Sequence, residues 1–175
     1  MTKVVGAVLF LACALVGRAH ADDVAGAFGL ARGYEIADRV LVLKSERKLH
    51  LLKAGRILRT FDISLGLMPT GHKEREGDYR TPEGLYYLES KNPDSDYFLS
   101  IKVSYPNAED RARAKAAGVD PGGQIMIHGL PNVPKYDEQR YRTTDWTDGC
   151  IAVSNADMID IWLMTRESTP IEIRP

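Results

Sequence analysis

The sequence has few cysteines, and it has no long hydrophobic run and no large excess of one charge. Two cysteines among 175 residues exclude a disulfide-dense scaffold and a zinc site built from four thiolates. The 23 basic and 24 acidic side chains give a net charge of −1, which argues against a nucleic-acid partner. A hydrophobic content of 44% excludes a disordered chain. Length and composition together predict one globular domain.

The longest apolar run lies close to the N-terminus. Lys3 precedes the nearly continuous apolar residues 4–16, and residues 19–21 (Ala-His-Ala) have the small-x-small pattern of a cleavage site. This run is shorter than the roughly 18 residues that suggest a spanning helix. We therefore expect residues 1–21 to be a signal peptide, cleaved after Ala21, with export to the periplasm and no stable membrane span after cleavage. An uncleaved membrane anchor and lipidation at Cys13 are the alternatives.

Cleavage at this point would leave Cys150 as the single cysteine of the mature chain. A lone thiol in an exported protein is buried and inert, paired between chains, or reactive.

Most of the mature chain has the patterns of β-strands. Residues 22–38 lack periodicity and are expected to be a lead-in segment before a domain over residues 39–175. Asn107 can cap a helix that ends at Gly118, and Ser154 can cap a second helix. The fold class is therefore mainly β with two or three short α-helices. The expected strands lie at residues 40–43, 49–52, 60–65, 85–89, 98–103, 124–127 and 171–173, and residues 66–84 and 135–146 are expected to be extended loops.

Two segments place a reactive side chain beside glycine at the end of an apolar stretch. His128 precedes Gly129, and Cys150 follows Gly149. Acyl transfer by a thiol needs a thiolate, a base and N–H donors for the oxyanion. Cys150 could be the nucleophile and His128 the base, with the backbone N–H groups of Gly149 and Cys150 as donors. The alternative is that both side chains belong to the core. No metal-ligand motif is present, so no metal site is expected.

The segments HG and TDGCIAV resemble the signature of the L,D-transpeptidase catalytic domain (YkuD-type) family of bacterial cell-wall enzymes. The resemblance covers residues 39–175 and includes the GDYRTPEG loop and the final PIEIRP strand. The block DWTDGCIAV from Asp145 makes the sequence most similar to the YafK-like subgroup. It implies a β-sandwich or barrel-like fold, no cofactor, and a cysteine-dependent enzyme that acts on peptidoglycan stem peptides through a thioester. In the subgroup, peptidoglycan-attached lipoprotein is a further partner.

The sequence departs from the family pattern at two positions. Asp148 stands where many members have histidine, and Ala152 stands where many have arginine, which puts donor recognition in doubt. Arg80 could contact a substrate carboxylate, because arginine binds carboxylate at two points. The complete set of expected substrate-binding residues is Arg80, Gly129, Trp146, Thr147 and Asp148.

Several functions are compatible with this set of residues. The leading expectation is an L,D-transpeptidase. The alternatives are a thiol hydrolase of the same fold, acting as an L,D-carboxypeptidase or as an amidase that releases peptidoglycan-attached lipoprotein, and a non-catalytic wall-binding module. A sortase-like enzyme would need a catalytic arginine on a late strand, where only Arg166 and Arg174 are available.

Overall fold

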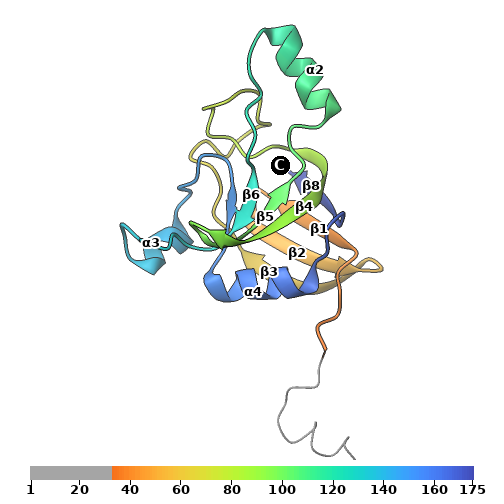
Figure 1. The fold of residues 1–175 in the computed structure, drawn as a ribbon, viewed down its shortest axis with the longest axis vertical. Helices are drawn as coiled ribbons and strands as arrows, with labels where there is room; N and C mark the ends of the chain where they lie inside the picture. The colour runs from red at the N-terminus through yellow and green to blue at the C-terminus, as the bar shows by residue number, and fades with distance from the viewer. Residues whose placement is uncertain (1–32) are drawn as a thin grey trace, which may run out of the picture. The chain divides into compact units, whose positions relative to one another are not determined.

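The structure, a computed structural model, describes residues 33–175, so the expected signal peptide lies outside the described residues. Figure 1 shows a curved sheet with short helices around it. The strands are β1 (Arg39–Leu43), β2 (Lys48–Lys53), β3 (Arg56–Asp62), β4 (Gly84–Ser95), β5 (Phe98–Val103), β6 (Met126–His128), β7 (Ile151–Ala152) and β8 (Pro170–Arg174). The helices are α2 (Ala108–Ala117), α3 (Glu138–Thr143) and α4 (Asn155–Met164).

The eight described strands have the order β3-β2-β1-β8-β4-β5-β6-β7. The long strand β4 joins the two halves of this arrangement, because its first residues pair with β8 and the remainder pairs with β5. The β4–β5 register shifts between Leu88 and Lys91 and again between Asn92 and Ser95. Such irregularities bend a strand and increase its twist. The prediction of a mainly β fold is confirmed.

The core follows from strand alternation. Val40 and Val42 of β1 are fully buried, as are Leu49 and Leu51 of β2, whereas the residues between them are partly exposed. This is the period-2 pattern of a sheet with one face in the core. Helix α4 covers the core with three buried side chains, those of Met158, Ile161 and Met164.

The helix ends follow the predicted caps. Asn107 forms a capping box at the start of α2, and Gly118 ends that helix in the left-handed conformation. Ser154 caps α4. The expectation of an uninterrupted loop over residues 135–146 is wrong, because six of these residues form α3 with Asp137 as its N-cap. Such a short helix has too few turns to show a periodic pattern.

The loop between β3 and β4 is held by two buried lysines. The Lys44 ammonium donates to the carbonyl oxygens of Gly71 (2.6 Å) and Thr81 (3.0 Å) and to the carboxylate of Glu83 (2.7 Å). The Lys73 ammonium donates to Asp78 (2.8 Å). Burial alone would raise the pKa of Asp78, but hydrogen bonds from Lys73 and from three backbone N–H groups lower it to about 2. These contacts fix the loop, whose Arg80 backbone packs against Gly149.

Candidate active site

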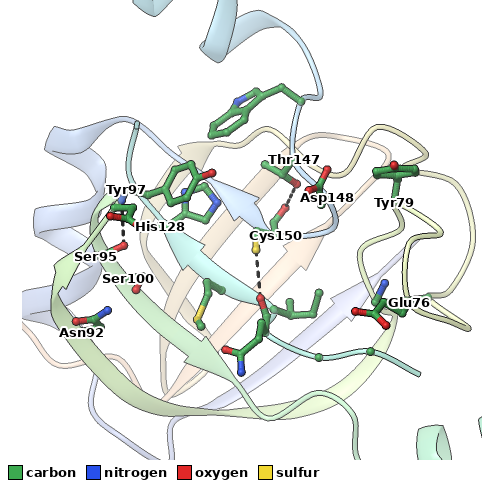
Figure 2. A pocket seen from close by; sticks show the side chains of 18 of the residues that line it. Glu76, Tyr79, Asn92, Ser95, Tyr97, Ser100, His128, Thr147, Asp148 and Cys150 are labelled. Atoms are coloured by element: carbon green, nitrogen blue, oxygen red, sulfur yellow. Dashed lines mark hydrogen bonds between the residues drawn. The ribbon is translucent and has the colours of Figure 1, made fainter. Parts of the chain in front are cut away.

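Strands β6 and β7 bring His128 and Cys150 to one face of the sheet. The two strands are parallel, with Ile127 opposite Ile151 and His128 opposite Ala152. Both isoleucines are fully buried in the core. Because side chains alternate along a strand, His128 and Cys150 project from the other face. There both line a cavity of about 660 Å³, and Figure 2 shows them facing the same hollow.

The turn before Cys150 depends on a glycine. Gly149 has φ +130°, a backbone conformation that L side chains rarely adopt. A Cβ atom at this position would lie 2.7 Å from the carbonyl oxygen of Arg80 and 3.3 Å from the Ile125 side chain. The glycine therefore lets the segment that carries Cys150 pass close to the β3–β4 loop.

Thr147 closes the same turn with its side chain. Its hydroxyl donates to the carbonyl oxygen of Cys150 at 2.8 Å and accepts from the N–H of Gly149 at 3.2 Å. Figure 2 shows the first of these bonds above the sulfur. The N–H of Cys150, by contrast, has no hydrogen-bond partner among residues 33–175. Of the two expected oxyanion donors, Cys150 N–H is thus the one already free.

The orientation of His128 is set by its neighbour. Its Nδ1 lies 2.7 Å from the carbonyl oxygen of Gly129. Because a carbonyl only accepts, Nδ1 carries the hydrogen and Nε2 keeps a free lone pair. Burial lowers the pKa of His128 to about 4, although the Gly129 carbonyl opposes that shift. The imidazole is therefore a neutral base at neutral pH.

The thiol of Cys150 is also neutral in this arrangement. Burial raises its pKa, and the carboxylate of Asp148 raises it further, while the N–H of Met126 and the charge of Lys73 act in the opposite direction. The sulfur donates a hydrogen bond to the carbonyl oxygen of Gln124 at 3.5 Å and does not hydrogen-bond to His128. The site thus holds a neutral thiol near a neutral imidazole.

The other expected site residues separate into two groups. Trp146, Thr147 and Asp148 line the cavity. Gly129 does not line it, and a Cβ atom there would lie 2.6 Å from the Asn155 side chain and 3.0 Å from Phe98, so this glycine allows close packing behind His128.

Arg80 is not brought to the cavity by its side chain. Its Nη1 donates to the carbonyl oxygen of His72 and to the Glu74 carboxylate, both at 3.3 Å. Its backbone, which packs against Gly149, is its link to the site. Ala152, at the other unusual position, is buried and bridges to Ser64, so its side chain offers nothing to a substrate.

One wall of the cavity could not be predicted from the sequence. The β4–β5 hairpin supplies Asn92, Ser95, Tyr97 and Ser100. The Tyr97 ring lies 4.6 Å from the His128 ring between centroids, and Trp146 lies 5.6 Å from it. Neither spacing nor motif links these residues to His128, because the pairing of β5 with β6 brings them together.

Within residues 33–175, no group of three His, Cys, Asp or Glu side chains is placed to hold a metal ion. That same part of the chain contains no helix with the length and hydropathy needed to cross a membrane.

The fold and this pair of side chains define a cysteine-and-histidine site on a β scaffold. The chain belongs to the YkuD family: residues 37–173 match the model of the L,D-transpeptidase catalytic domain. The family resemblance stated from the sequence is confirmed. YafK of Escherichia coli (strain K12) is 35% identical over 96 residues, which cover 51% of this chain and 37% of YafK.

Solved structures show the same relationship. The helical cell shape determining protein Pgp2 from Campylobacter jejuni matches with a TM-score of 0.56 and 30% identity, covering 78% of this chain and 46% of Pgp2. Bd1075 of Bdellovibrio bacteriovorus matches with a TM-score of 0.54 and 25% identity, over 81% of this chain and 51% of Bd1075. An L,D-transpeptidase from Xylanimonas cellulosilytica shares the fold at 19% identity and a TM-score of 0.52, over 80% of this chain and 61% of the other. This chain thus spans about half the length of Pgp2 and Bd1075, and less of YafK.

Proposed function

We propose that this protein is a cysteine-dependent L,D-transpeptidase that acts on peptidoglycan stem peptides through a thioester acyl-enzyme. The observation that carries the proposal is the arrangement of His128, whose Nδ1 is fixed by Gly129 and whose Nε2 is free, on the same cavity face as Cys150. Membership of the family supports the substrate class.

The first step forms the thioester. The Cys150 sulfur attacks the carbonyl carbon of the scissile amide at the L-centre of diaminopimelate, and its proton passes to Nε2 of His128. The thiol must first leave the Gln124 carbonyl, which a rotation about the Cys150 Cα–Cβ bond achieves. The C–N bond then breaks, and Nε2 returns the proton to the departing amine of D-alanine. The neutral resting pair makes this a proton transfer coupled to attack rather than attack by a preformed thiolate.

The developing oxyanion needs N–H donors. Cys150 N–H is free to donate, whereas Gly149 N–H must be shared with the Thr147 hydroxyl or released from it. A single donor of this kind contributes about 3 kcal/mol to the transition state in comparable acyl-transfer sites.

The second step decides the outcome. An amine of another stem peptide attacks the thioester to form a cross-link, with His128 accepting its proton and the thiol regenerated. If water attacks instead, the enzyme is a carboxypeptidase, or an amidase when the leaving group belongs to peptidoglycan-attached lipoprotein. Of these two reactions we propose attack by the amine, which forms a cross-link. We also propose that the protein acts in the periplasm after removal of residues 1–21. Because the relative Pgp2 is a helical cell shape determining protein, we propose a role in cell-wall remodelling and cell shape.

The deciding experiment compares wild type with Cys150→Ala on purified muropeptides, with mass analysis of the products. A cross-linked dimer that only wild type forms supports transpeptidation, and a shortened peptide with water added supports hydrolysis. A carbapenem tests the nucleophile independently, since it should form a covalent adduct on Cys150. No product and no adduct would leave the non-catalytic module as the explanation.

A further inference from the structure

The imidazole of His128 packs against two aromatic rings that come from different parts of the chain. The Tyr97 ring lies 4.6 Å from it between centroids, with 47° between the ring planes, and Figure 2 shows the two side chains in contact. The Trp146 ring meets the imidazole edge-on at 5.6 Å and stacks on the Tyr97 ring at 6.1 Å. All three residues line the cavity, yet His128 is only 4% exposed. The two rings therefore help to shield the imidazole from water.

The turn between β4 and β5, which carries Tyr97, has an unusual backbone. Ser95 of β4 pairs with Phe98 of β5 across this turn. Phe98 has φ +62°, in the left-handed region that a bulky side chain rarely adopts. Such conformations persist where neighbouring contacts impose them, and they concentrate at functional sites. The turn therefore needs contacts that hold it.

The segment that follows His128 supplies these contacts through Asn132. The backbone N–H of Asn132 donates to the carbonyl oxygen of Asp96 at 2.9 Å, and its side-chain amide donates to that of Ser95 at 2.8 Å. The amide oxygen accepts from the N–H of Phe98 at 2.8 Å. Asn132 thus binds the turn at three successive points.

Gly129 connects the same turn directly to the base. Its N–H is shared between the carbonyl oxygens of Tyr97 (3.1 Å) and Leu99 (3.2 Å), and its own carbonyl oxygen lies 2.7 Å from Nδ1 of His128. A single hydrogen bond at Nδ1 fixes one edge of the imidazole and still allows the ring to tilt about that edge. The Tyr97 ring, packed beside the imidazole, limits this tilt.

We propose that Tyr97 is a positioning residue, which keeps Nε2 of His128 directed towards Cys150 and keeps water from the imidazole, and that Asn132 holds the turn in the conformation that this requires. The inference rests on the proposed function and deepens it, because Tyr97 acts through the base of the acyl-transfer step.

Charged groups around the cavity do not set the protonation of His128. Burial lowers the pKa of His128 to about 4, and the hydrogen bond to Gly129 opposes this shift. Apart from tyrosines, the titratable groups that share the cavity come from the β3–β4 loop, the β4–β5 hairpin and the segment before β7: Lys73, Glu76, Asp94, Asp96, Asp148 and Cys150. None of them is among the causes of the shift. Loss of the Tyr97 ring should therefore change the pKa of His128 through burial.

The pH dependence of carbapenem acylation, followed by mass spectrometry of the adduct, tests this role. The pKa of the base in the free enzyme sets the midpoint at which the second-order rate falls in acid. In Tyr97→Ala water reaches the imidazole, so this midpoint should rise by about one pH unit. The rate on the plateau should fall about tenfold, because the base is less well placed.

Two further variants separate the ring from the hydroxyl and from the turn. Tyr97→Phe keeps the ring that contacts the imidazole, so it should restore both the wild-type midpoint and the wild-type rate. Asn132→Ala removes the side-chain contacts to the turn and should change both quantities in the same direction as Tyr97→Ala.

Tyr87→Ala is the matched control. Tyr87 lies on β4, is 58% exposed and does not line the cavity, so its removal should leave the pH profile unchanged. An NMR titration of the His128 imidazole in each variant measures the same midpoint without any reaction. Thermal unfolding curves show that each variant is folded, and a loss of stability alone would not move the titration midpoint of the folded protein.

The outcomes separate the two proposals. A wild-type profile in Tyr97→Ala, or equal behaviour of Tyr97→Phe and Tyr97→Ala, would overturn the role of the Tyr97 ring and leave the enzyme proposal intact. A wild-type profile in Asn132→Ala would overturn the role of Asn132. If the wild type forms no Cys150-dependent adduct, the enzyme proposal itself fails, and the NMR midpoints still decide whether Tyr97 controls the imidazole.

Discussion

The guanidinium group of Arg47 holds the carboxylate of Asp145, with Nε 3.2 Å from both oxygens and Nη2 2.7 Å from Oδ2. Asp145 Oδ1 also accepts from the N–H of Leu65 at 2.9 Å. This pair joins the β1–β2 turn to the first residue of the segment that delivers Cys150. Two-point contacts between arginine and carboxylate fix geometry as well as adding attraction.

Arg47→Lys should therefore weaken the connection although it keeps the charge. Lysine cannot contact both carboxylate oxygens in the planar arrangement, so we expect a loss of about 1 kcal/mol in the free energy of unfolding. A double-mutant cycle with Asp145→Asn in urea measures the coupling between the two side chains. Arg56→Lys is the control, because its pair with Glu35 is exposed on both sides and should contribute almost nothing. An equal loss in the free energy of unfolding for Arg47→Lys and Arg56→Lys would contradict a special role for the Arg47–Asp145 pair.

Thr147→Val tests the turn that carries the nucleophile. Valine has nearly the same shape, but it leaves the Cys150 carbonyl and the Gly149 N–H without the Thr147 hydroxyl. Because Thr147 is buried, we expect a loss of stability of about 1–3 kcal/mol. We also expect a fall in carbapenem acylation rate of roughly tenfold or more, since misplacing a reacting group is costly.

Thr147→Ser is the matched variant, because it keeps the hydroxyl and removes only a methyl group. It should retain most of the acylation rate. If valine and serine behaved alike, the hydroxyl would have no part in placing Cys150.

Gly149→Ala should abolish acylation and reduce stability. The positive φ costs an alanine about 1–3 kcal/mol, and the added Cβ would also meet the Arg80 carbonyl oxygen at 2.7 Å. Gly118→Ala separates these two causes, since Gly118 has φ +68° with no atom near its Cβ position. That control should lose only the conformational part, about 1 kcal/mol, and stay fully active. Urea unfolding and adduct formation followed by mass spectrometry give both quantities.

The sequence brought His128 and Cys150 together as a pair, and the structure places both on one cavity, but most of the lining around them was not predicted. His128 is the last residue of β6 and Cys150 stands directly before β7, each beside a glycine, and that local pattern is visible in a single sequence. The helix caps at Asn107 and Ser154 are also local signals, and both are present. Tyr97 could not be predicted, because a strand register brings it to His128 from 31 residues away.

Arg80 shows a different limit of sequence reasoning. Its residue type suits a carboxylate, but the direction of its side chain depends on how the β3–β4 loop folds around Asp78. The Asp78 carboxylate accepts from the Arg80 N–H at 3.1 Å, and the guanidinium then lies beside Glu74. The contacts that decide this arrangement involve several loop residues at once, so no single motif reveals it.

The pH dependence of carbapenem acylation should report the neutral pair. Since burial lowers the pKa of His128 to about 4, the base form is lost only as the pH falls through that value, and not near the ordinary histidine value of about 6.5. Because the pKa of Cys150 is raised, little thiolate forms below the ordinary cysteine pKa of about 8.5, and ionisation of the thiol adds little to the rate there. We therefore expect a rate plateau from about pH 5 to 8.5. A midpoint close to 6.5 would contradict the buried, neutral imidazole.

The same shift makes a prediction for stability. An unfolded chain binds a proton on this histidine below about pH 6.5, whereas the folded protein does so only below about 4, so protonation favours unfolding between the two values. The contribution of the neutral His128 to stability is fully present above about pH 6.5. The free energy of unfolding should therefore fall by about 2 kcal/mol between pH 7 and 4.5. Urea unfolding at both values measures the loss. His128→Gln removes the titrating group, so the part of the stability loss that belongs to His128 should disappear in this variant. If the loss were unchanged, groups other than His128 would be its cause.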